Sequence, residues 1–345
     1  MKKKYILYRY LILSLLLLLG GCEKDKKPAH DKTIYRAAMS GASARTIVNG
    51  GTAQDSKPEE SCCNFTNGRP GEIRISEDKK TIYIHGWVDI DRLSDHRTRK
   101  AEKIVFCKNA GVRIDWDAEY IYRPWLQDAP LVRELIVEDG NPYLYARDGM
   151  LIQRAGAKYD PDSETLLETL IFCVPCKEGE INIPEGVQYL YDCAFLGCSR
   201  ITSVSLPASL KEVGGAALGD MDSCTSIRAY KNSKTYYSQN GILYGRDENR
   251  YDGTSIIAYP AGKRDTIYNT VPKYVEEVGY GAFFGADHLR EVHLPSRIQI
   301  FYDSAFQQCK NLQKVTVKNK KKIPRVAEDA FKDCPKLKEH VKSKR

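Results

Sequence analysis

Apolar residues recur along the second half of the chain with a period in the low twenties. Each period carries the spacing L-x-x-V-x-L, then a proline, and later an Ala-Phe pair usually followed by Cys, as in YDSAFQQCKNLQKVTV (residues 302–317). The paired Ala residues are 23 positions apart from 194 to 217 and from 282 to 305, and 25 apart from 305 to 330. Agreement at so many positions indicates a structural repeat. The five copies contain Ala194-Phe195, Ala217-Leu218, Ala282-Phe283, Ala305-Phe306 and Ala330-Phe331.

This period is typical of a solenoid, in which each coil lays down one short strand and then turns back. The x-V-x-L segment predicts the strand, and the proline marks its end because proline cannot donate a ladder hydrogen bond. The Ala-Phe-x-x-Cys segment predicts a short helical turn whose Phe and Cys side chains fill the core. Cys309 is therefore expected to pack as a small buried residue, since Ala286 takes the equivalent position in the third copy.

A longer sequence repeat contains the short one. Residues 141–153 resemble residues 232–245, and each segment is centred on a tight-turn dipeptide, Asp148-Gly149 or Asn240-Gly241. Because these dipeptides lie between residues that favour strands, each segment predicts a β-hairpin. A proline-containing exit and then two coils follow each hairpin. The predicted order is hairpin, coil, coil, hairpin, coil, coil and C-terminal cap.

These linked motifs resemble the BspA-like leucine-rich repeat family. The resemblance covers about residues 130–340 and includes Tyr-x-x-Asp-Gly-x-Leu at 145–151 and Tyr-Pro-x-Gly-Lys at 259–263. It implies a curved repeat solenoid, a β-rich leucine-rich repeat of mixed α/β type with short helical turns and β-hairpin inserts. It also implies an exported bacterial protein of a kind that commonly binds host or neighbouring-cell surfaces.

Upstream of the repeats, GEIRISEDKKTIYIHGWVDI (residues 71–90) alternates apolar and polar residues on both sides of EDKK. This alternation predicts a pair of strands. We expect the pair to belong to an N-terminal β cap over residues 66–100 that covers the first coil. The leucine-rich repeat solenoid is then expected to occupy residues 101–345 and to end in a basic C-terminal cap.

The first 21 residues have the composition of a secretory signal, with a basic start, the apolar run LILSLLLLL and small residues before Cys22. The ending LGGC resembles the bacterial lipobox, which implies cleavage before Cys22 and lipidation of its thiol. The alternative is an ordinary signal peptide with an incidental cysteine. Residues 22–65 contain few large apolar groups and predict a flexible tether. We therefore expect an exported lipoprotein of the outer membrane, held at the cell surface by acyl chains alone.

Loss of the signal removes four basic residues and leaves a net charge of +4 on the mature chain. Most of the remaining excess lies in residues 318–345, which contain 11 Lys or Arg against 4 Asp or Glu. The rest of the mature chain is slightly acidic, which disfavours a nucleic-acid binder. The basic tail is either a solvated end cap or a segment attracted to anionic surfaces.

Four cysteines are spaced loosely like a zinc site or a redox pair. Each aligns with a small residue in another copy, which favours packing over the two alternatives, a disulfide and a metal site. A further adjacent pair precedes the folded body and has no role that the sequence assigns. The four are Cys173, Cys176, Cys193 and Cys198, and the adjacent pair is Cys62 and Cys63.

Enzyme chemistry is disfavoured, because no polar residues occur in a catalytic spacing. The segment GYGAFFG (residues 279–285) is one residue off a dinucleotide-binding loop and lies inside a repeat. We accordingly expect no catalytic residues, no metal and no cofactor.

A binding surface is predicted from strand alternation, because residues beside the central Val of each strand point away from the core. We expect stacked coils to join these positions into one extended sheet surface. Tyrosines of the second hairpin are added because their rings can stack on sugars or anchor a protein, although they can equally cover the hairpin's own core. The candidate residues are Arg133, Glu134, Ser203, Ser205, Arg290, Glu291, His293, Lys314, Thr316, Tyr236 and Tyr237.

Two functions remain open from the sequence. The first is adhesion or host interaction, in which the surface binds an extracellular or host protein or a glycan. The second is a structural scaffolding subunit of an envelope assembly that faces the periplasm.

Overall fold

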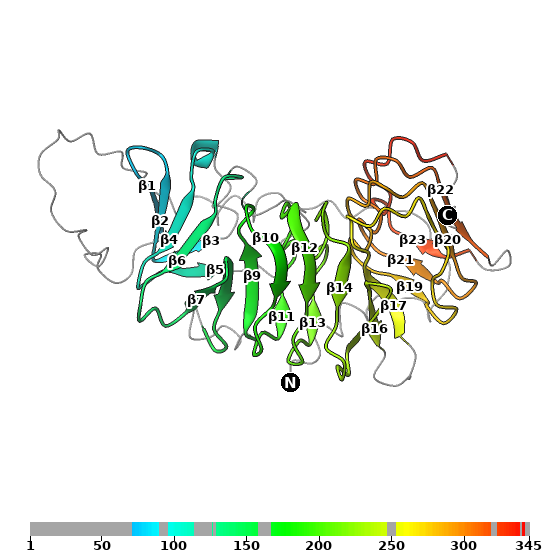
Figure 1. The fold of residues 1–345 in the computed structure, drawn as a ribbon, viewed down its shortest axis with the longest axis horizontal. Coiled ribbons are helices and arrows are strands. Elements are labelled where there is room, and N and C mark those ends of the chain that lie inside the picture. Colours follow the sequence, from blue (N-terminus) through cyan, green and yellow to red (C-terminus); the bar gives the residue numbers. More distant parts are fainter. Residues whose placement is uncertain are drawn as a thin grey trace, which may run out of the picture. The chain divides into compact units, whose positions relative to one another are not determined.

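A computed structural model describes residues 71–89, 96–113, 126, 129–157, 167–246, 253–318, 323–338 and 340–341. All of these lie in residues 44–345, the second of two compact units of the chain. The predicted signal, the lipidation residue Cys22, the tether, and the Cys62-Cys63 pair lie outside the described residues. Figure 1 shows the strands of the second unit following one another along the chain.

The V-x-L segments form parallel strands, one for each coil. β10 (Glu178–Asn182), β12 (Arg200–Ser205) and β14 (Ser226–Arg228) make a three-stranded parallel sheet, called here the middle sheet. A second set makes the C-terminal sheet, and the central Val of each predicted strand is buried. This set is β18 (Ile267–Tyr268), β20 (Glu291–Leu294) and β22 (Lys314–Val317).

Each coil adds a second, shorter strand to another sheet, which the two hairpins extend. One such sheet has the order β13-β11-β9-β8-β7, and the other has the order β15-β16-β17-β19-β21-β23. The first comprises β7 (Leu144–Arg147), β8 (Met150–Gln153), β9 (Thr169–Cys173), β11 (Tyr189–Leu190) and β13 (Glu212–Val213). The second comprises β15 (Tyr236–Gln239), β16 (Ile242–Arg246), β17 (Gly253–Ala258), β19 (Glu277–Val278), β21 (Ile300–Phe301) and β23 (Arg325–Val326).

Both predicted hairpins are confirmed. β7 pairs antiparallel with β8, and β15 with β16. The turn residues Asp148 and Gly149 have φ angles of 51° and 78°, and Asn240 and Gly241 have φ angles of 54° and 79°. Two successive residues at positive φ are what a two-residue turn of type I′ requires, and Asp-Gly or Asn-Gly adopts this conformation at low cost. The dipeptides therefore fix the hairpin register.

The predicted N-terminal strand pair is also present. β1 (Glu72–Ile75) pairs antiparallel with β2 (Thr81–His85), and β2 in turn pairs in parallel with β4 (Lys103–Phe106). β4 continues in parallel to β6 (Glu134–Val137), which completes the N-terminal sheet. Parallel stacking thus begins at β2. A separate two-stranded parallel sheet joins β3 (Trp87–Asp89) to β5 (Gly111–Arg113).

The Ala-Phe segments are turns without a helix, in contrast to the short helical turns expected. The one helical element among the described residues is the 3-10 turn η2 (His96–Thr98). In each of four coils the residue before Ala lies at positive φ, which no right-handed helix allows. A second residue of positive φ follows three positions after the Ala. The first set is Cys193, Ala216, Gly281 and Ser304; the second is Gly197, Asp220, Gly285, Gln308 and Asp333.

This alternation turns backbone groups along the stacking direction, so that the turns form a hydrogen-bonded ladder of their own. The N–H of Phe195 donates to the carbonyl of Ala217 at 2.9 Å, and the N–H of Phe306 donates to that of Ala330 at 2.7 Å. The ladder also crosses the second hairpin, because the N–H of Ala216 donates to the carbonyl of Tyr280 at 3.2 Å. The turns therefore stack in register from coil to coil.

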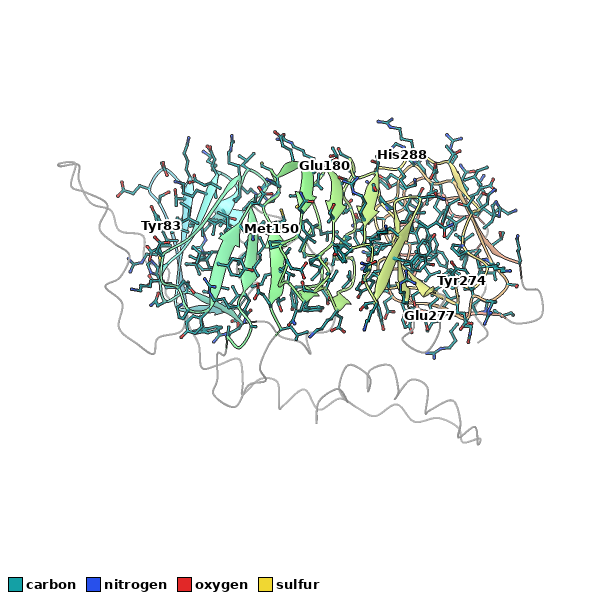
Figure 2. All side chains as sticks on the ribbon, turned by 60° about the horizontal axis from the view of Figure 1, so that its bottom comes forward. Tyr83, Met150, Glu180, Tyr274, Glu277 and His288 are labelled. Carbon is teal, nitrogen blue, oxygen red and sulfur yellow. The ribbon has the colours of Figure 1, made fainter. Side chains whose placement is uncertain are left out.

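The register brings aromatic rings into a stack inside the solenoid. Phe283 and Phe306 have ring centroids 4.5 Å apart and nearly parallel planes, and Phe306 stacks on Phe331 at 5.3 Å. Tyr259 from the hairpin exit continues the stack onto Phe283 at 5.2 Å. Figure 2 shows how densely side chains fill the space between the sheets, where Met150 is fully buried. The last three coils thus each contribute one ring to a shared stack.

Replacing Gly281 by Ala should lower the free energy of unfolding by about 2–4 kcal/mol. The residue has a φ of 59°, and an added Cβ would lie 2.8 Å from the Cα and 2.9 Å from the N of Ala216. Gly179→Ala is the matched control, because Gly179 has a φ of 82° and its added Cβ meets nothing within 4 Å. It should cost about 1 kcal/mol in urea denaturation. Equal losses in the two variants would contradict close contact between the turns.

Candidate functional site

Four candidate residues lie together on the C-terminal sheet. Glu291 is in register with Lys314, and His293 is in register with Thr316. The Nδ1 atom of His293 is 2.7 Å from the Thr316 hydroxyl, and its Nε2 atom is 3.0 Å from a Glu291 carboxylate oxygen. All four side chains are half-buried, which leaves polar atoms accessible on a rigid sheet. We call these four residues the His293 patch; Arg290, which is exposed, directly precedes it.

Two candidates on the N-terminal sheet are engaged with their neighbours. Glu134 is in register with Lys103 and its carboxylate lies 3.1 Å from the Lys103 ammonium. Arg133 approaches Glu102 at 3.6 Å, and Glu102 also pairs with Lys80 at 3.2 Å. Exposed ion pairs of this kind contribute little to stability, at most about 1 kcal/mol each. They do neutralise the charges that this sheet presents to a partner.

The two serines of the middle sheet differ in accessibility. Ser203 is only 4% exposed, because the Arg228 guanidinium reaches across from β14 and donates to the Ser203 hydroxyl at 2.8 Å. The same guanidinium approaches Glu180, labelled in Figure 2, at 3.5 Å. Ser205 is half-buried and in register with Arg228. The accessible charged groups of this sheet are therefore those of Arg228 and Glu180, which the sequence analysis did not single out.

The expectation of one extended sheet surface is wrong. The candidate strands belong to three separate sheets: the N-terminal sheet holds β6, the middle sheet holds β12, and the C-terminal sheet holds β20 and β22. The second hairpin causes the break after β14, because the N–H of Ile227 donates to the carbonyl of Gly241 at 2.8 Å. The hairpin turn thus occupies the strand edge that the next coil would need.

The hairpin tyrosines also depart from expectation. Tyr236 is 7% exposed and belongs to the core, with its hydroxyl donating to the Lys211 carbonyl at 3.3 Å. Its assignment to an exposed surface was therefore wrong, and the alternative that it covers the hairpin's core is correct. Tyr237 is half-buried, stacks on Tyr244 at 5.1 Å, and carries the Arg246 guanidinium 4.8 Å above its ring. Adjacent strand residues face opposite sides, which separates the two rings.

Six of the eight cysteines in the described part of the chain are buried, whereas Cys176 and Cys334 are half-buried. Cys309 has no exposed surface, and its Sγ donates to the Phe283 carbonyl at 3.0 Å. Cys173 and Cys198 share one core cluster, while Cys193 lies in another with Ala216 and Phe284. All eight cysteines in the described part of the chain are free thiols. In that same part, no three His, Cys, Asp or Glu side chains gather as they would around a metal ion.

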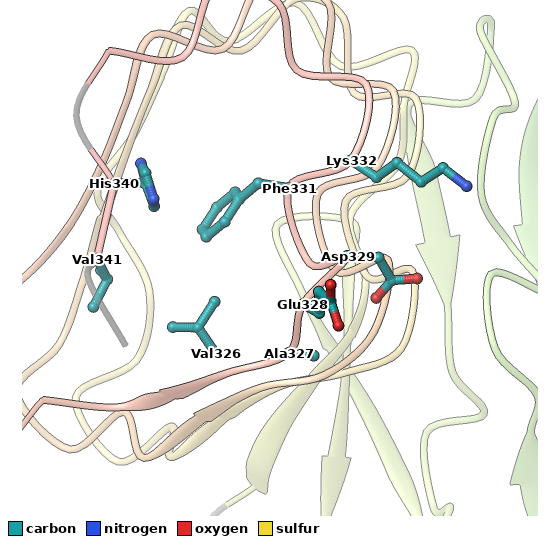
Figure 3. A pocket seen from close by; sticks show the side chains of 8 residues that line it. All are labelled: Val326, Ala327, Glu328, Asp329, Phe331, Lys332, His340 and Val341. Atoms are coloured by element: carbon teal, nitrogen blue, oxygen red, sulfur yellow. The ribbon is translucent and has the colours of Figure 1, made fainter. Parts of the chain in front are cut away.

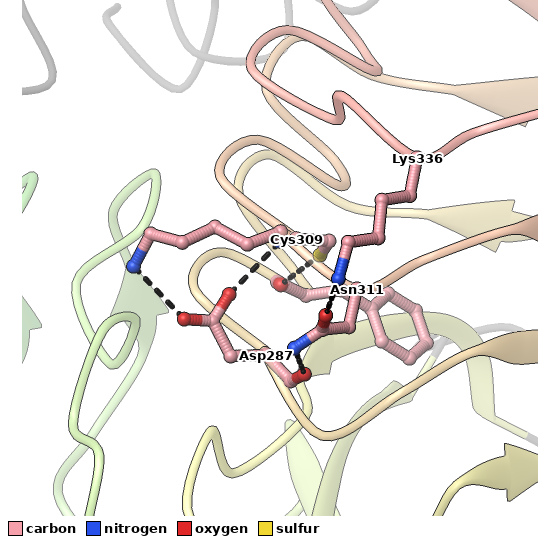
Figure 4. A network of polar contacts seen from close by, with 6 residues as sticks. Asp287, Cys309, Asn311 and Lys336 are labelled. Carbon is pink, nitrogen blue, oxygen red and sulfur yellow. Dashed lines mark hydrogen bonds and ion pairs between the residues drawn. The ribbon is translucent and has the colours of Figure 1, made fainter.

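A row of polar side chains follows the repeat cysteine positions in sequence and bonds from coil to coil (Figure 4). The sequence did not predict this row. The Lys310 ammonium lies 2.9 Å from the Asp287 carboxylate, and the Asn311 amide donates to the Asp287 carbonyl at 2.9 Å. The Lys336 ammonium then donates to the Asn311 side-chain oxygen at 2.6 Å. These contacts tie the last three coils together at their rim. The only sequence signal was a polar residue one or two positions after Ala286, Cys309 and Cys334.

Asp220 lies near this row, at one of the turn positions of positive φ. Burial, together with the negative charge of Asp222, raises the pKa of its carboxyl to about 6. The backbone N–H of Asp220 donates to the Phe284 carbonyl at 3.0 Å, which holds the side chain at the joint between the two halves of the repeat body. At neutral pH the Asp220 carboxylate therefore carries its charge although it is partly buried.

The last coil leaves an open cavity of about 440 Å³ at the C-terminal end (Figure 3). Val326, Phe331 and Val341 make its apolar lining, and Glu328 stands at its edge. The His340 ring lies 5.3 Å from the Phe331 ring and partly covers the end of the aromatic stack. The cavity is thus where a further coil would continue the core.

A family model for the BspA type leucine rich repeat region matches residues 168–241 and 263–344 with six copies. These residues form a BspA-type leucine-rich repeat region. The match leaves out residues 242–262, which contain the second hairpin strand β16 and the strand β17. No curated protein matches the chain.

Several solved structures are similar to this chain. A leucine-rich repeat protein from Eubacterium ventriosum is 15% identical, with 77% of this chain and 80% of that chain covered and a TM-score of 0.44. A leucine rich cell surface protein from Faecalibacterium prausnitzii is 14% identical, with 81% and 89% covered and a TM-score of 0.40. The pneumococcal vaccine antigen PcpA is 17% identical, with 73% and 53% covered and a TM-score of 0.36. Scores below 0.5 support no functional conclusion.

Within the described ranges of the chain, no helix is long and apolar enough to cross a membrane.

Replacing Asp220 by Asn should raise the free energy of unfolding at pH 7 by about 1–3 kcal/mol and leave it unchanged near pH 4. The folded carboxyl has a pKa of about 6 against an ordinary Asp value of 3.8, so the folded state binds more protons between these pH values. Wild-type stability therefore falls as the pH rises through that window, and the variant should lack this decline.

The control is Asp333→Asn, which changes an exposed Asp at the equivalent position of the last coil, also at positive φ. Asn suits this conformation, so any gain from the backbone should appear in both variants. Urea denaturation from pH 4 to 8 measures the difference. Parallel curves for Asp220→Asn and wild type would contradict a carboxyl of raised pKa.

Proposed function

We propose that this protein is a lipid-anchored cell-surface protein that binds a macromolecular partner through the exposed sheets of its repeat body. The carrying observation is the His293 patch, in which four polar side chains from two adjacent strands are held in register by parallel pairing. A sheet imposes little reorganisation on binding, because its side chains are already positioned by the ladder. A repeat solenoid offers such surfaces by its architecture.

The proposed role is adhesion or host interaction, with an extracellular or host protein or a glycan as the partner. The patch carries an acid, a base, an imidazole and a hydroxyl within two strands, so it can both donate and accept hydrogen bonds. This mixture of groups fits a ligand surface that carries both donors and acceptors better than it fits a purely anionic ligand surface. The resemblance of residues 1–22 to a lipoprotein signal supports export and attachment through Cys22 to the outer membrane.

The second candidate is a structural scaffolding subunit that faces the periplasm. It is favoured by the N-terminal sheet, where Arg133, Glu102, Lys103 and Glu134 form charge pairs among themselves. A surface whose charges are already paired suits a solvated wall more than a recognition site. Protease added to intact cells separates the two functions, because a periplasmic protein would be protected and a surface protein would be cut.

The double variant Glu291→Ala/Lys314→Ala should weaken binding at least about tenfold in an array of extracellular-matrix proteins and glycans probed with the full mature chain. The matched control is Lys103→Ala/Glu134→Ala, which removes an in-register acid-base pair from the N-terminal sheet. It should leave binding unchanged. Absence of any ligand for a folded wild-type chain would remove the adhesion proposal, and equal losses in both variants would remove the patch as its site.

Cys22→Ser provides the test of anchoring. The variant should move from the membrane fraction to the soluble fraction and should lose metabolic labelling with a fatty acid, because the acyl chains need the Cys22 thiol. Retention of the label would contradict lipidation at this residue.

A further inference from the structure

Two cysteines of the last two coils lie directly one above the other. The N–H of Phe306 donates to the Ala330 carbonyl at 2.7 Å, and the N–H of Gln308 donates to the Lys332 carbonyl at 3.0 Å. This register places Cys309 opposite Cys334, since each is the third residue after its repeat Phe. Backbones paired in this way lie about 4.7–4.9 Å apart. That spacing falls inside the range of about 4.4–6.8 Å between Cα atoms that a disulfide needs.

The two thiols also point the same way. The Sγ of Cys309 donates to the Phe283 carbonyl at 3.0 Å, and the Sγ of Cys334 donates to the Phe306 carbonyl at 2.9 Å. Each sulfur therefore takes the same acceptor, one coil back from its own. The two thiols are near enough for each to shift the pKa of the other. The hydrogen-bonded register thus already holds the two cysteines at a backbone spacing that a disulfide can bridge.

Accessibility distinguishes the two sulfurs. Cys309 has no exposed surface, whereas Cys334 is half-buried on the last coil. The neighbouring Cys309 side chain lowers the pKa of the Cys334 thiol, and burial raises that of Cys309. A thiolate is the attacking species in disulfide exchange. Cys334 is thus the residue that an external oxidant meets first, with Cys309 directly behind it.

Another pair of neighbouring cysteines lacks this asymmetry. The Sγ of Cys198 lies 3.6 Å from the carbonyl of Cys173, and these two residues are 0% and 4% exposed. Neither sulfur is open to a bulky oxidant. Cys173 and Cys198 therefore serve as an internal control for the effect of accessibility.

We infer that Cys334 and Cys309 form a disulfide that ties the last coil to the coil before it. The Cys334 thiolate attacks one sulfur of an exported or small-molecule disulfide, forms a mixed disulfide, and expels the other sulfur as a thiolate that takes up a proton. Cys309 then loses its proton to solvent and attacks the Cys334 sulfur, which releases the second thiol of the oxidant. Two protein thiols are oxidised and one external disulfide is reduced to two thiols.

The bond has a structural purpose at this position. A terminal coil contacts a neighbour on one side only, so it opens most easily. Its Phe331 ring ends the aromatic stack and lines the open cavity. A covalent link across 25 residues removes conformations from the opened state, which favours closure. The inference depends on the proposed function in one respect: export brings the chain to a compartment with disulfide oxidants.

The test treats purified full-length chain with glutathione disulfide and maps its peptides by mass spectrometry without reduction. Wild type should yield a linked peptide pair containing Cys309 and Cys334. Cys309→Ala should keep glutathione on Cys334, because the second thiol is missing. This variant is expected to fold, since Ala286 fills the equivalent position in another coil and is buried there. Cys334→Ala should leave Cys309 unmodified.

A second readout reports the consequence for the coil. Oxidation should slow tryptic cleavage after Lys332, Lys336 and Lys338 by about tenfold in wild type and not in either variant, and dithiothreitol should reverse it. Persistent glutathione on Cys334 of wild type, or no reaction there at all, would overturn the inference. Linkage of Cys173 to Cys198 at the same rate would overturn the accessibility argument. None of these outcomes depends on whether the protein binds a partner.

Discussion

Backbone hydrogen bonds that pass from one coil to the next are the interaction on which this structure depends. They run through the strands and also through the Ala-Phe turns, where residues of positive φ aim N–H and C=O groups along the stack. Because these bonds fix the register, identical positions of successive coils must lie above one another. The stack of Phe283, Phe306 and Phe331 and the row of thiols follow from that register. A backbone hydrogen bond in the protein replaces one made with water, so its net contribution to stability is small. Burial of apolar side chains supplies most of the stability.

The sequence was sufficient for the strands and the hairpins, and the reasons are local. Val204, Val292 and Val315 are buried where the V-x-L spacing places them. Asp148-Gly149 and Asn240-Gly241 require no tertiary contact to specify their turns. The turn geometry was not accessible in the same way. Cys193 aligns with Gly281 and Ser304, and small size alone was taken as the reason, whereas the shared property is a positive φ.

The surface was predicted less well, because it depends on contacts between distant segments. The break in the sheets arises where Gly241 meets Ile227, and no spacing along the chain announces it. Tyr236 and Tyr237 are chemically identical neighbours, so alternation could not show which ring faces inward. Arg228 covers Ser203 from the next coil, and Glu102 approaches Arg133 in the same manner. Partners one coil away decide what each outward residue presents.

The contact between turns across the second hairpin has a consequence for how repeat proteins of this kind evolve. The turn of one coil bonds directly to the turn of a coil 64 positions later, from Ala216 to Tyr280, through main-chain atoms alone. Any sequence carries those atoms, and the joint adds the need for a residue such as Gly281 that leaves room beside Ala216. A whole block can therefore be copied or deleted in the gene when that residue is kept. Length is then free to vary in steps of one block, like the 92 residues that separate Gly149 from Gly241, while the geometry of each joint stays the same.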